Sequence, residues 1–579
     1  MNGSILLLVA CAVFGAGYFI YSRFVARWLG LDARRKTPAQ ELADGRDYVP
    51  TNRVVLLGSH FAAIAGAGPV LGPVLASPFG WGAVALWIVL GCVLIGSVHD
   101  MTALFLSVRH KGVSIGSIIE GILGRRGKMV FLIFCFVTLI FVMAEFTRQV
   151  AASFVSNPEV ASASLLSIPQ AALFGYLVYR KRWSVLVASL IFVPMLFGLL
   201  WLGIIFPCDL QALLGVSAAQ AQLIWTAVLL AYCFIASAFP VWLMLQPRGY
   251  LNAWLLYAML AMGLVGILIA CPVLQADAFA GFSLESSVKG TMYLFPLLFV
   301  TVACGACSGF HSLVSSGTTS KQVANEKDIR FVGYGAMLLE GVVAIMALIA
   351  VAILPQSDLF VKVTQGTVPP VRLFAEGLAG FATSFGLPET LGVSFVMLAV
   401  AAFLMTTVDA CTRLARFTWQ ELMTPPQGVT AGKSRKILSN TNMATGIVVA
   451  ICLFLLVGCP AITKNLWTIF ASGNQLLAAL ALLTATLWLS QNGKRCFFVL
   501  IPMIFMLVTS LTAVVQLILM GMRTWKAAGW MAGFGSGGVL TIGTTALFCL
   551  GVYIFTLGLK TAWNHARAHR PELNAESAK

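Results

Sequence analysis

Acidic and histidine side chains inside long apolar stretches are the residues of this sequence best suited to chemistry. Glu340 lies in the middle of one such stretch, without a charged partner nearby in the sequence. Glu145 lies in another, and Arg148 follows three positions later on the same face of a helix. His60 and His311 lie in two further stretches. Ionisable groups inside a membrane are costly and usually functional, so we predict proton coupling by His60, Glu145, His311 and Glu340.

The chemistry of these side chains supports this prediction but leaves alternatives open. A carboxyl group in a low-dielectric interior resists ionisation, so Glu340 can load and release a proton near neutral pH. Imidazole exchanges protons in the same range. The alternative for Glu145 and Arg148 is a structural ion pair, and the alternative for the histidines is hydrogen-bonded packing. Arg148 could also bind a substrate carboxylate.

Other charged residues lie near the ends of apolar stretches and are predicted to have structural roles. Asp100 follows His99 directly, and Asp409 precedes Arg413 by four positions. Residues four apart share a helix face. We therefore predict structural ion pairs that involve Asp100, Asp409 and Arg413.

Two apolar stretches contain residues that break a helix at membrane depth. The first runs from His60 to Pro73 and is rich in glycine and proline, and the second contains Pro296 and a glycine-rich segment over 303–319. Glycine and proline disfavour helix. In hydrocarbon such a break survives only where protein or a wet cavity receives the freed backbone groups. Paired broken helices indicate the binding site of a transporter.

We therefore predict that the breaks form the substrate site, where free backbone groups and helix ends would favour a carboxylate. The residues predicted to bind substrate are Gly66, Gly68, Pro69, Gly72, Gly305, Ser308, Gly309, Ser315, Ser316, Thr318 and Arg148. Leucine at Gly68 or Gly309 should then cost transport more than folding. The alternative is that these glycines only permit close helix packing.

Composition places these residues in a polytopic membrane protein. The 579 residues are 59% hydrophobic and only 10% charged, with a mean hydropathy of +0.92, whereas soluble domains carry about 25% charged residues. Apolar runs of about 20 residues recur throughout. We predict one all-α transmembrane domain over 1–579 with about 15 spans, near 3–22, 54–77, 81–107, 129–153, 162–179, 184–206, 221–245, 251–274, 290–313, 331–354, 390–411, 441–459, 465–489, 495–520 and 534–558.

The distribution of basic residues predicts the orientation of these spans. When alternate connections are assigned to alternate sides, one side receives 30 of the 37 lysines and arginines and the other side six. Basic residues favour the cytoplasmic side. The N-terminus is therefore predicted to be outside and the tail over 559–579 cytoplasmic. This assignment explains the net charge of +16, so we predict no nucleic-acid partner. The segment that starts at Arg372 is predicted to form an interfacial amphipathic helix.

Several kinds of site have no motif here. The sequence lacks GxxxxGK[ST] and HExxH, and we predict no enzymatic activity, no cofactor and no metal. Cys304 and Cys307 form a CxxC, but inside an apolar span and outside any βαβ unit. The amides of Asn474 and Gln475 also lie within a span, where we expect them to form hydrogen bonds between helices.

The longest motifs resemble one family, the carbon starvation protein A (CstA) family of membrane transporters. The resemblance covers about 45–490 and leaves extra C-terminal helices over about 495–558. It rests on Thr51–Arg53, Gly58–Pro69, Gly72–Ala76, Gly96–Asp100, Ala303–Ser312, Ser315–Thr319, Gly333–Leu338, Thr406–Asp409 with Arg413 and Arg416, and Asn474–Leu480. Ser59 stands where many members carry a second histidine, and the chain is shorter than the longest members.

The resemblance implies a LeuT-like core of inverted repeats that contains two broken helices. It also implies proton-coupled uptake of short peptides or pyruvate across the bacterial inner membrane, in response to carbon starvation stress. The expected partners are this small substrate, protons and the lipid bilayer. An intramembrane enzyme and a channel are the alternative functions. The substrate and the oligomeric state stay open.

Overall fold

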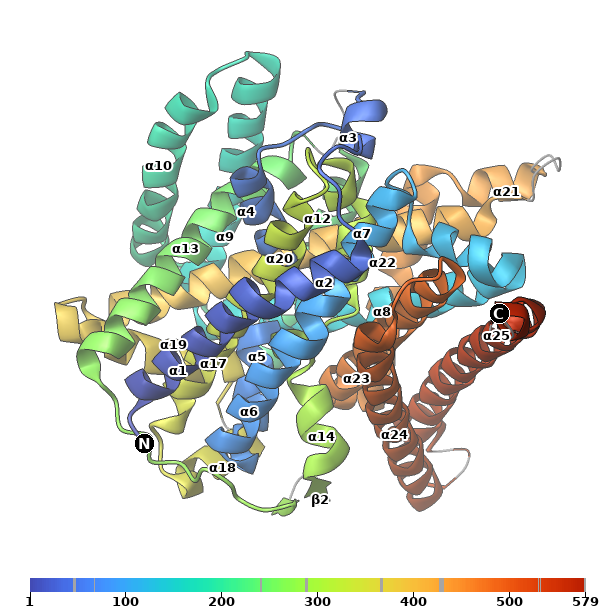
Figure 1. Cartoon of the computed structure of the whole chain (residues 1–579). Helices are drawn as coiled ribbons and strands as arrows, with labels where there is room; N and C mark the ends of the chain where they lie inside the picture. Colours follow the sequence, from blue (N-terminus) through green and yellow to red (C-terminus); the bar gives the residue numbers. More distant parts are fainter. Residues whose placement is uncertain are drawn as a thin grey trace.

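The computed structural model describes residues 1–44, 48–66, 68–239, 242–286, 290–364, 368–425, 432–529, 531 and 533–576. Helices make up almost all of it, and long helices cross one another around a few enclosed central ones (Figure 1). The all-α fold class is confirmed. This follows from the composition, because a chain in hydrocarbon must satisfy its backbone groups internally.

The N-terminal part contains the first broken span. Its elements are α1 (Gly3–Ala16), η1 (Gly17–Tyr21), α2 (Ser22–Leu29), α3 (Pro38–Glu41), α4 (Arg53–Ile64), α5 (Gly68–Ala76), η2 (Ser77–Phe79), α6 (Trp81–Gly91), η3 (Cys92–Gly96), α7 (Ser97–Arg109) and α8 (Ile115–Ser156).

The middle part contains the second broken span and a short antiparallel hairpin, in which Leu284 pairs with Met292. Its elements are α9 (Pro158–Gly175), η4 (Tyr176–Arg180), α10 (Val185–Ile205), α11 (Leu210–Leu214), α12 (Ala218–Ala238), α13 (Leu245–Ala270), β1 (Ser283–Ser286), β2 (Gly290–Tyr293), α14 (Leu294–Thr301), α15 (Ala303–Ala306), α16 (Phe310–Gly317), η5 (Thr319–Lys321), η6 (Arg330–Tyr334) and α17 (Gly335–Ala352).

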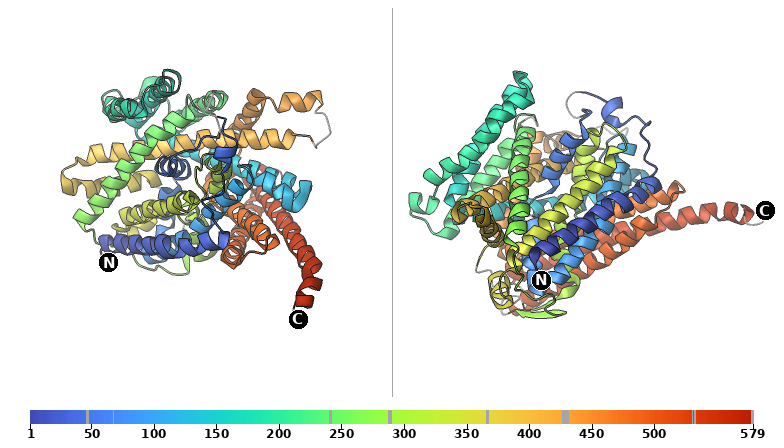
Figure 2. Two further views of the ribbon diagram at one scale, coloured as in Figure 1. Left: turned by 45° about the horizontal axis from the view of Figure 1, so that its top comes forward. Right: turned by 60° about the vertical axis from the view of Figure 1, so that its left-hand side comes forward.

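The C-terminal part supplies two of the most enclosed helices, α20 and α23. Its elements are α18 (Gln356–Thr364), α19 (Pro370–Ala382), η7 (Thr383–Phe385), α20 (Glu389–Met423), α21 (Lys433–Leu438), α22 (Thr441–Gly458), α23 (Pro460–Gln491), α24 (Phe497–Ala527), η8 (Phe534–Gly538) and α25 (Val539–Glu576). The predicted tail over 559–579 begins as a continuation of α25, which projects away from the other helices (Figure 2).

The described residues contain fewer helices of membrane-spanning length than the predicted 15 spans. Within the described residues, 13 helices are long and apolar enough to cross a membrane, and a bent pair of helices raises the number to 14. The remaining predicted span, 290–313, is divided among α14, α15 and α16, which have 8, 4 and 8 residues. Because none of these is long enough to cross alone, the predicted count is not established.

Segments predicted to lie on opposite sides of the membrane are found near opposite ends of the helical assembly. In Figure 1, α3 and α21 lie near the upper end, whereas the N-terminus, α18 and β2 lie near the lower end. The first two helices belong to predicted cytoplasmic segments. The N-terminus and α18 belong to predicted external ones, and β2 lies at the predicted external end of the span over 290–313. The side that faces the cytoplasm stays a prediction.

The segment after Arg372 is helical, but its apolar face packs against protein. Leu373, Phe374 and Leu378 of α19 are buried, and Arg372 and Glu376 on the opposite face form an exposed ion pair at 2.8 Å. Glycine permits this packing, because a Cβ at Gly377 would lie 2.1 Å from the carbonyl oxygen of Ala350 in α17. The helix therefore covers α17 instead of placing its apolar face in lipid.

Candidate functional site

The first broken span bends by 48° between α4 and α5. The helix stops at Ala65, whose backbone is non-helical, and resumes at Gly68. The second broken span leaves helix at Val302 and again at Cys307, which has an extended backbone. Both predicted breaks are present, and glycine and proline are the physical reason.

The two breaks touch each other. A Cβ at Gly68 would lie 2.3 Å from the Cβ of Cys304, and one at Gly72 would lie 2.8 Å from the carbonyl oxygen of Thr301. Near the start of α4, the N–H of Thr51 donates to the carbonyl of Gln322, just beyond the end of α16 (3.0 Å). The two spans therefore run in opposite directions, as predicted, although the larger inverted repeat stays a prediction.

Asn474 of α23 satisfies the backbone that the second break frees. The N–H of Phe310 donates to Asn474 Oδ1 at 2.8 Å, and the N–H of Gly309 donates to the Asn474 carbonyl at 3.1 Å. Asn474 Nδ2 donates to Ser308 Oγ at 2.9 Å. The neighbouring amide of Gln475 donates to the Phe299 carbonyl at 2.6 Å. The expectation that these amides form hydrogen bonds between helices is confirmed.

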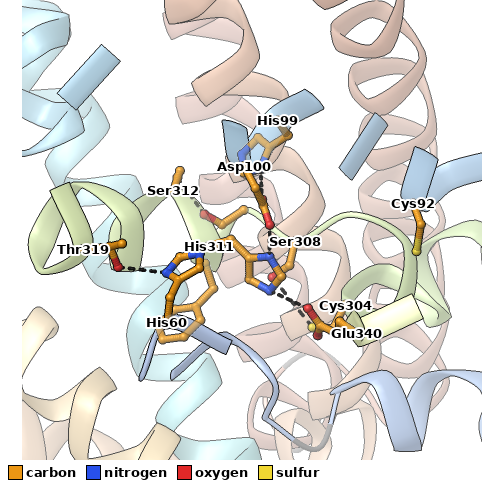
Figure 3. A network of polar contacts seen from close by, with 12 residues as sticks. His60, Cys92, His99, Asp100, Cys304, Ser308, His311, Ser312, Thr319 and Glu340 are labelled. Carbon is orange, nitrogen blue, oxygen red and sulfur yellow. Dashed lines mark hydrogen bonds and ion pairs between the residues drawn. The ribbon is translucent and has the colours of Figure 1, made fainter. Parts of the chain in front are cut away.

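A row of titratable side chains lies beside the second break, and Figure 3 shows their contacts. His99 Nδ1 lies 2.8 Å from Asp100 Oδ1, and His311 Nδ1 lies 2.7 Å from Asp100 Oδ2. The other ring nitrogen of His311, Nε2, lies 3.2 Å from Glu340 Oε2. Asp100, His311 and Glu340 are all 0% exposed. We call His99, Asp100, His311 and Glu340 the buried row.

Close helix contacts bring the buried row together. Asp100 lies on α7, His311 on α16 and Glu340 on α17. A Cβ at Gly96 would lie 2.2 Å from the carbonyl of Ala306, and one at Gly333 would lie 3.0 Å from Cα of Met101. These glycines let α7 approach the second broken span and the helix that carries Glu340.

His60 lies beside the buried row but bonds elsewhere. Its Nδ1 lies 2.8 Å from Thr319 Oγ1, which follows α16. It is close enough to Asp100 and His311 to interact with them electrostatically, and its Nε2 has no hydrogen-bond partner among the described residues. Three of the four residues predicted for proton coupling, His60, His311 and Glu340, are thus brought together.

Glu145 lies apart from this group and has its own partners. Arg148 donates to it from Nη2 at 2.8 Å and from Nε at 3.1 Å, and Gln149 donates at 2.7 Å. All three residues lie on α8, so one helix satisfies the carboxylate. This geometry favours the structural alternative over proton coupling at Glu145.

The predicted pair of Asp409 and Arg413 is not formed. Asp409 Oδ2 accepts from Arg248 Nη1 at 2.8 Å and from the hydroxyl of Tyr232 at 2.6 Å. Arg413 instead donates to the carbonyls of Ala236 and Phe239. Carbonyls at the end of a helix lack intrahelical donors, and the end of α12 presents such carbonyls to Arg413.

Sequence reasoning missed two partners of the predicted ion pairs, namely Arg248 for Asp409 and His311 for Asp100. The predicted spans 221–245 and 251–274 leave Arg248 in the connection between them, but α13 begins at Leu245 and buries it. Asp100, predicted to form a structural ion pair, stands between two histidines in the buried row. Its neighbour His99, a second titratable residue in the predicted span 81–107, was the available signal.

Some hydroxyl groups after the second break form hydrogen bonds within their own helix, and one does not. Ser316 donates to the Ser312 carbonyl at 2.8 Å, and Thr318 donates to the Val314 carbonyl at 3.0 Å. Ser315 is buried, and its hydroxyl has no hydrogen-bond partner within the described ranges. Across those ranges, no group of three or more His, Cys, Asp or Glu residues could hold a metal ion.

Comparisons with known proteins relate the chain to transporters. It is 34% identical over 575 residues to "Peptide transporter CstA" of Campylobacter jejuni, covering 89% of this chain and 80% of that protein. It is 31% identical over 607 residues to "Pyruvate/proton symporter BtsT" of Escherichia coli, covering 91% and 82%. A solved manganese transporter of Eremococcus coleocola aligns with 13% identity and a TM-score of 0.49, covering 91% and 99%.

The family profile described as "Carbon starvation protein CstA" matches residues 2–368 and 361–513. This match begins before and ends after the region over 45–490 whose motifs carried the resemblance, and it includes both broken spans and the whole buried row. The chain therefore belongs to the carbon starvation protein CstA family.

Proposed function

We propose that the chain is a secondary transporter that imports a short peptide or pyruvate, together with protons, across the bacterial inner membrane. Relatives on both sides of this choice are similar over most of their length: one is named a peptide transporter and the other a pyruvate/proton symporter. Both substrates carry a carboxylate. The family description names carbon starvation, and we propose that uptake serves the cell under that condition.

The observation that carries the proton part of this proposal is the buried row beside the second break. Two carboxylates and an imidazole, all without exposure, lie in contact. Groups of this kind are retained in a membrane interior mainly where protons or ions must pass. Both Glu340 oxygens also lack an aligned hydrogen bond among the described residues, which suits a carboxyl group that must change its charge.

The substrate part of the proposal places the carboxylate at the touching breaks. Ser315 supports this placement, because its buried hydroxyl has no partner in the described chain. The other candidate residues at the breaks are Gly66, Gly68, Pro69, Gly72, Gly305, Ser308, Gly309, Ser316 and Thr318. Arg148 is a candidate for a second contact, since its side chain is the part-exposed member of its ion pair.

Uptake into proteoliposomes tests the proposed function. With an inward proton gradient, labelled pyruvate or a labelled di- or tripeptide is expected to accumulate above its equilibrium level. A protonophore should abolish this accumulation. A channel would only equilibrate the label, and an enzyme would release an altered product. Failure of every one of these substrates to accumulate under the gradient would reject the proposal.

The proposed orientation has the N-terminus outside and the C-terminus in the cytoplasm. A reporter that fluoresces only in the cytoplasm, fused after Lys579, should therefore be bright. The same reporter inserted after Gly386, an exposed position between η7 and α20, should be dark. A stable C-terminal fusion that stays dark would reverse the orientation.

A further inference from the structure

We infer that Asp100 is a positioning residue that keeps His311 charged and aimed at Glu340, so that Glu340 can exchange one proton in each transport cycle. The inference rests on the proposed proton coupling and assigns separate roles within the buried row. Glu340 is the group that exchanges, and Asp100 acts on it only through His311.

The geometry around His311 fixes the direction of its ring. A carboxylate only accepts hydrogen bonds, so Nδ1, which lies 2.7 Å from Asp100 Oδ2, carries a hydrogen. Nε2 is then the nitrogen that faces Glu340. His99 holds the other oxygen of Asp100 at 2.8 Å. Asp100 is thus tied between two imidazoles, and the ring of His311 cannot turn without breaking its 2.7 Å bond.

Charge balance in the dry interior explains why Asp100 matters. Two ionised carboxylates close together in low dielectric repel strongly unless a cation lies between them. His311 occupies that place. Ionised Asp100 favours the imidazolium form, and the imidazolium in turn makes an ionised Glu340 tolerable. Without this cation Glu340 would keep its proton, and the transporter could load but not release it.

The contact between His311 and Glu340 suits a group that must change its charge. Nε2 and Oε2 are within ion-pair distance, but neither atom takes part in an aligned hydrogen bond in the described structure. The other titratable groups that face the pair are His60 from α4, Cys92 from η3, and Cys304 and Cys307 from the second break. A thiol is neutral at physiological pH unless something stabilises its anion, and His60 bonds the hydroxyl of Thr319 instead of a carboxylate. His311 is therefore the cation in contact with Glu340.

The test uses Asp100→Asn, which keeps the size of the side chain and removes its charge. In proteoliposomes, the internal pH is varied while the external pH is kept constant. Because proton release to the inside becomes harder, the internal pH for half-maximal uptake is expected to move about one unit or more to the alkaline side. Exchange of internal for external substrate at equal pH should continue, because it requires no net proton release. Asp358→Asn, an exposed carboxyl on α18, is the matched control and should behave as the original protein.

The outcomes separate the inference from the proposed function. If uptake by the unsubstituted protein ignores internal pH, proton coupling itself is rejected. If that uptake responds but Asp100→Asn gives the same internal-pH profile, the positioning role is rejected. Nitrogen NMR of the six histidines in the unsubstituted protein gives a second test that does not depend on how the variant folds. The signal lost in His311→Gln should show both ring nitrogens protonated at pH 7, and a neutral His311 would overturn the inference.

Discussion

Glutamine at position 340 is expected to reduce accumulation against a gradient to the equilibrium level, while exchange of substrate across the membrane persists. The amide has the shape of the carboxyl group but cannot release a proton. Burying a neutral amide also costs less than burying a charge, so the variant should reach the membrane and keep its thermal stability. Accumulation and exchange, measured in the same proteoliposomes, check both parts of this expectation.

Two further substitutions make the result at Glu340 specific. Glu376→Gln removes a carboxyl that forms an exposed pair with Arg372, and transport should be unchanged because such pairs contribute little. Glu145→Gln tests the remaining alternative and is expected to keep its response to the proton gradient, since Glu145 is satisfied by its own helix. Unchanged accumulation by Glu340→Gln would remove Glu340 from the proton pathway.

Leucine at Gly309 is expected to abolish the folded transporter, together with its activity. A Cβ at this position would lie 2.2 Å from the carbonyl oxygen of Asn474 and 2.5 Å from the N–H nitrogen of Ala478. Both atoms belong to the backbone of α23, so the helix itself would have to move. Overpacking costs about 1–3 kcal/mol where side chains can adjust and more where they cannot. Thermal unfolding in detergent and the yield of monodisperse protein measure the loss.

This expectation replaces the one drawn from the sequence, in which leucine at Gly309 cost transport more than folding. The contacts at Gly309 and Gly68 favour the packing alternative. Gly198→Leu is the matched control, because no atom of the described residues lies within 4 Å of a Cβ there, and it should fold normally. Normal thermal stability of Gly309→Leu would show that the contact with α23 is not needed for folding.

The broken spans show what the local sequence can predict and what it cannot. Glycine and proline spaced through an apolar stretch leave the backbone few ways to stay helical, so both breaks are found where expected. The partner of a freed N–H group is a different matter. Asn474 lies more than 160 positions from Phe310, and its hydrogen bond depends on how α23 packs. Nothing near either residue in the sequence specifies that contact.

For the charged residues too, the sequence identifies the candidates but not their partners. Their occurrence inside apolar stretches identified His60, His311 and Glu340 as candidates. Such residues can be recognised from the sequence alone, and burying a charge in a membrane is costly. Helical spacing was then misleading at Asp409: Arg413 stands one turn away, but the carboxylate pairs with Arg248 of another helix. Helical spacing provides a possible partner on the same helix. The packing of α12, α13 and α20 determines which donor contacts the carboxylate.

The sequence by itself determined that this chain crosses the membrane many times as helices, that two of its spans are broken and that ionisable groups lie among them. These properties follow from hydropathy and backbone preference, which act within about 20 residues. Only the tertiary structure decided that the two breaks touch, that Asp100 stands between His99 and His311, and that Glu145 lies apart from Glu340. Those relations depend on contacts between helices distant in sequence, and small residues such as Gly96 and Gly333 permit the contacts without specifying which helix fills the space.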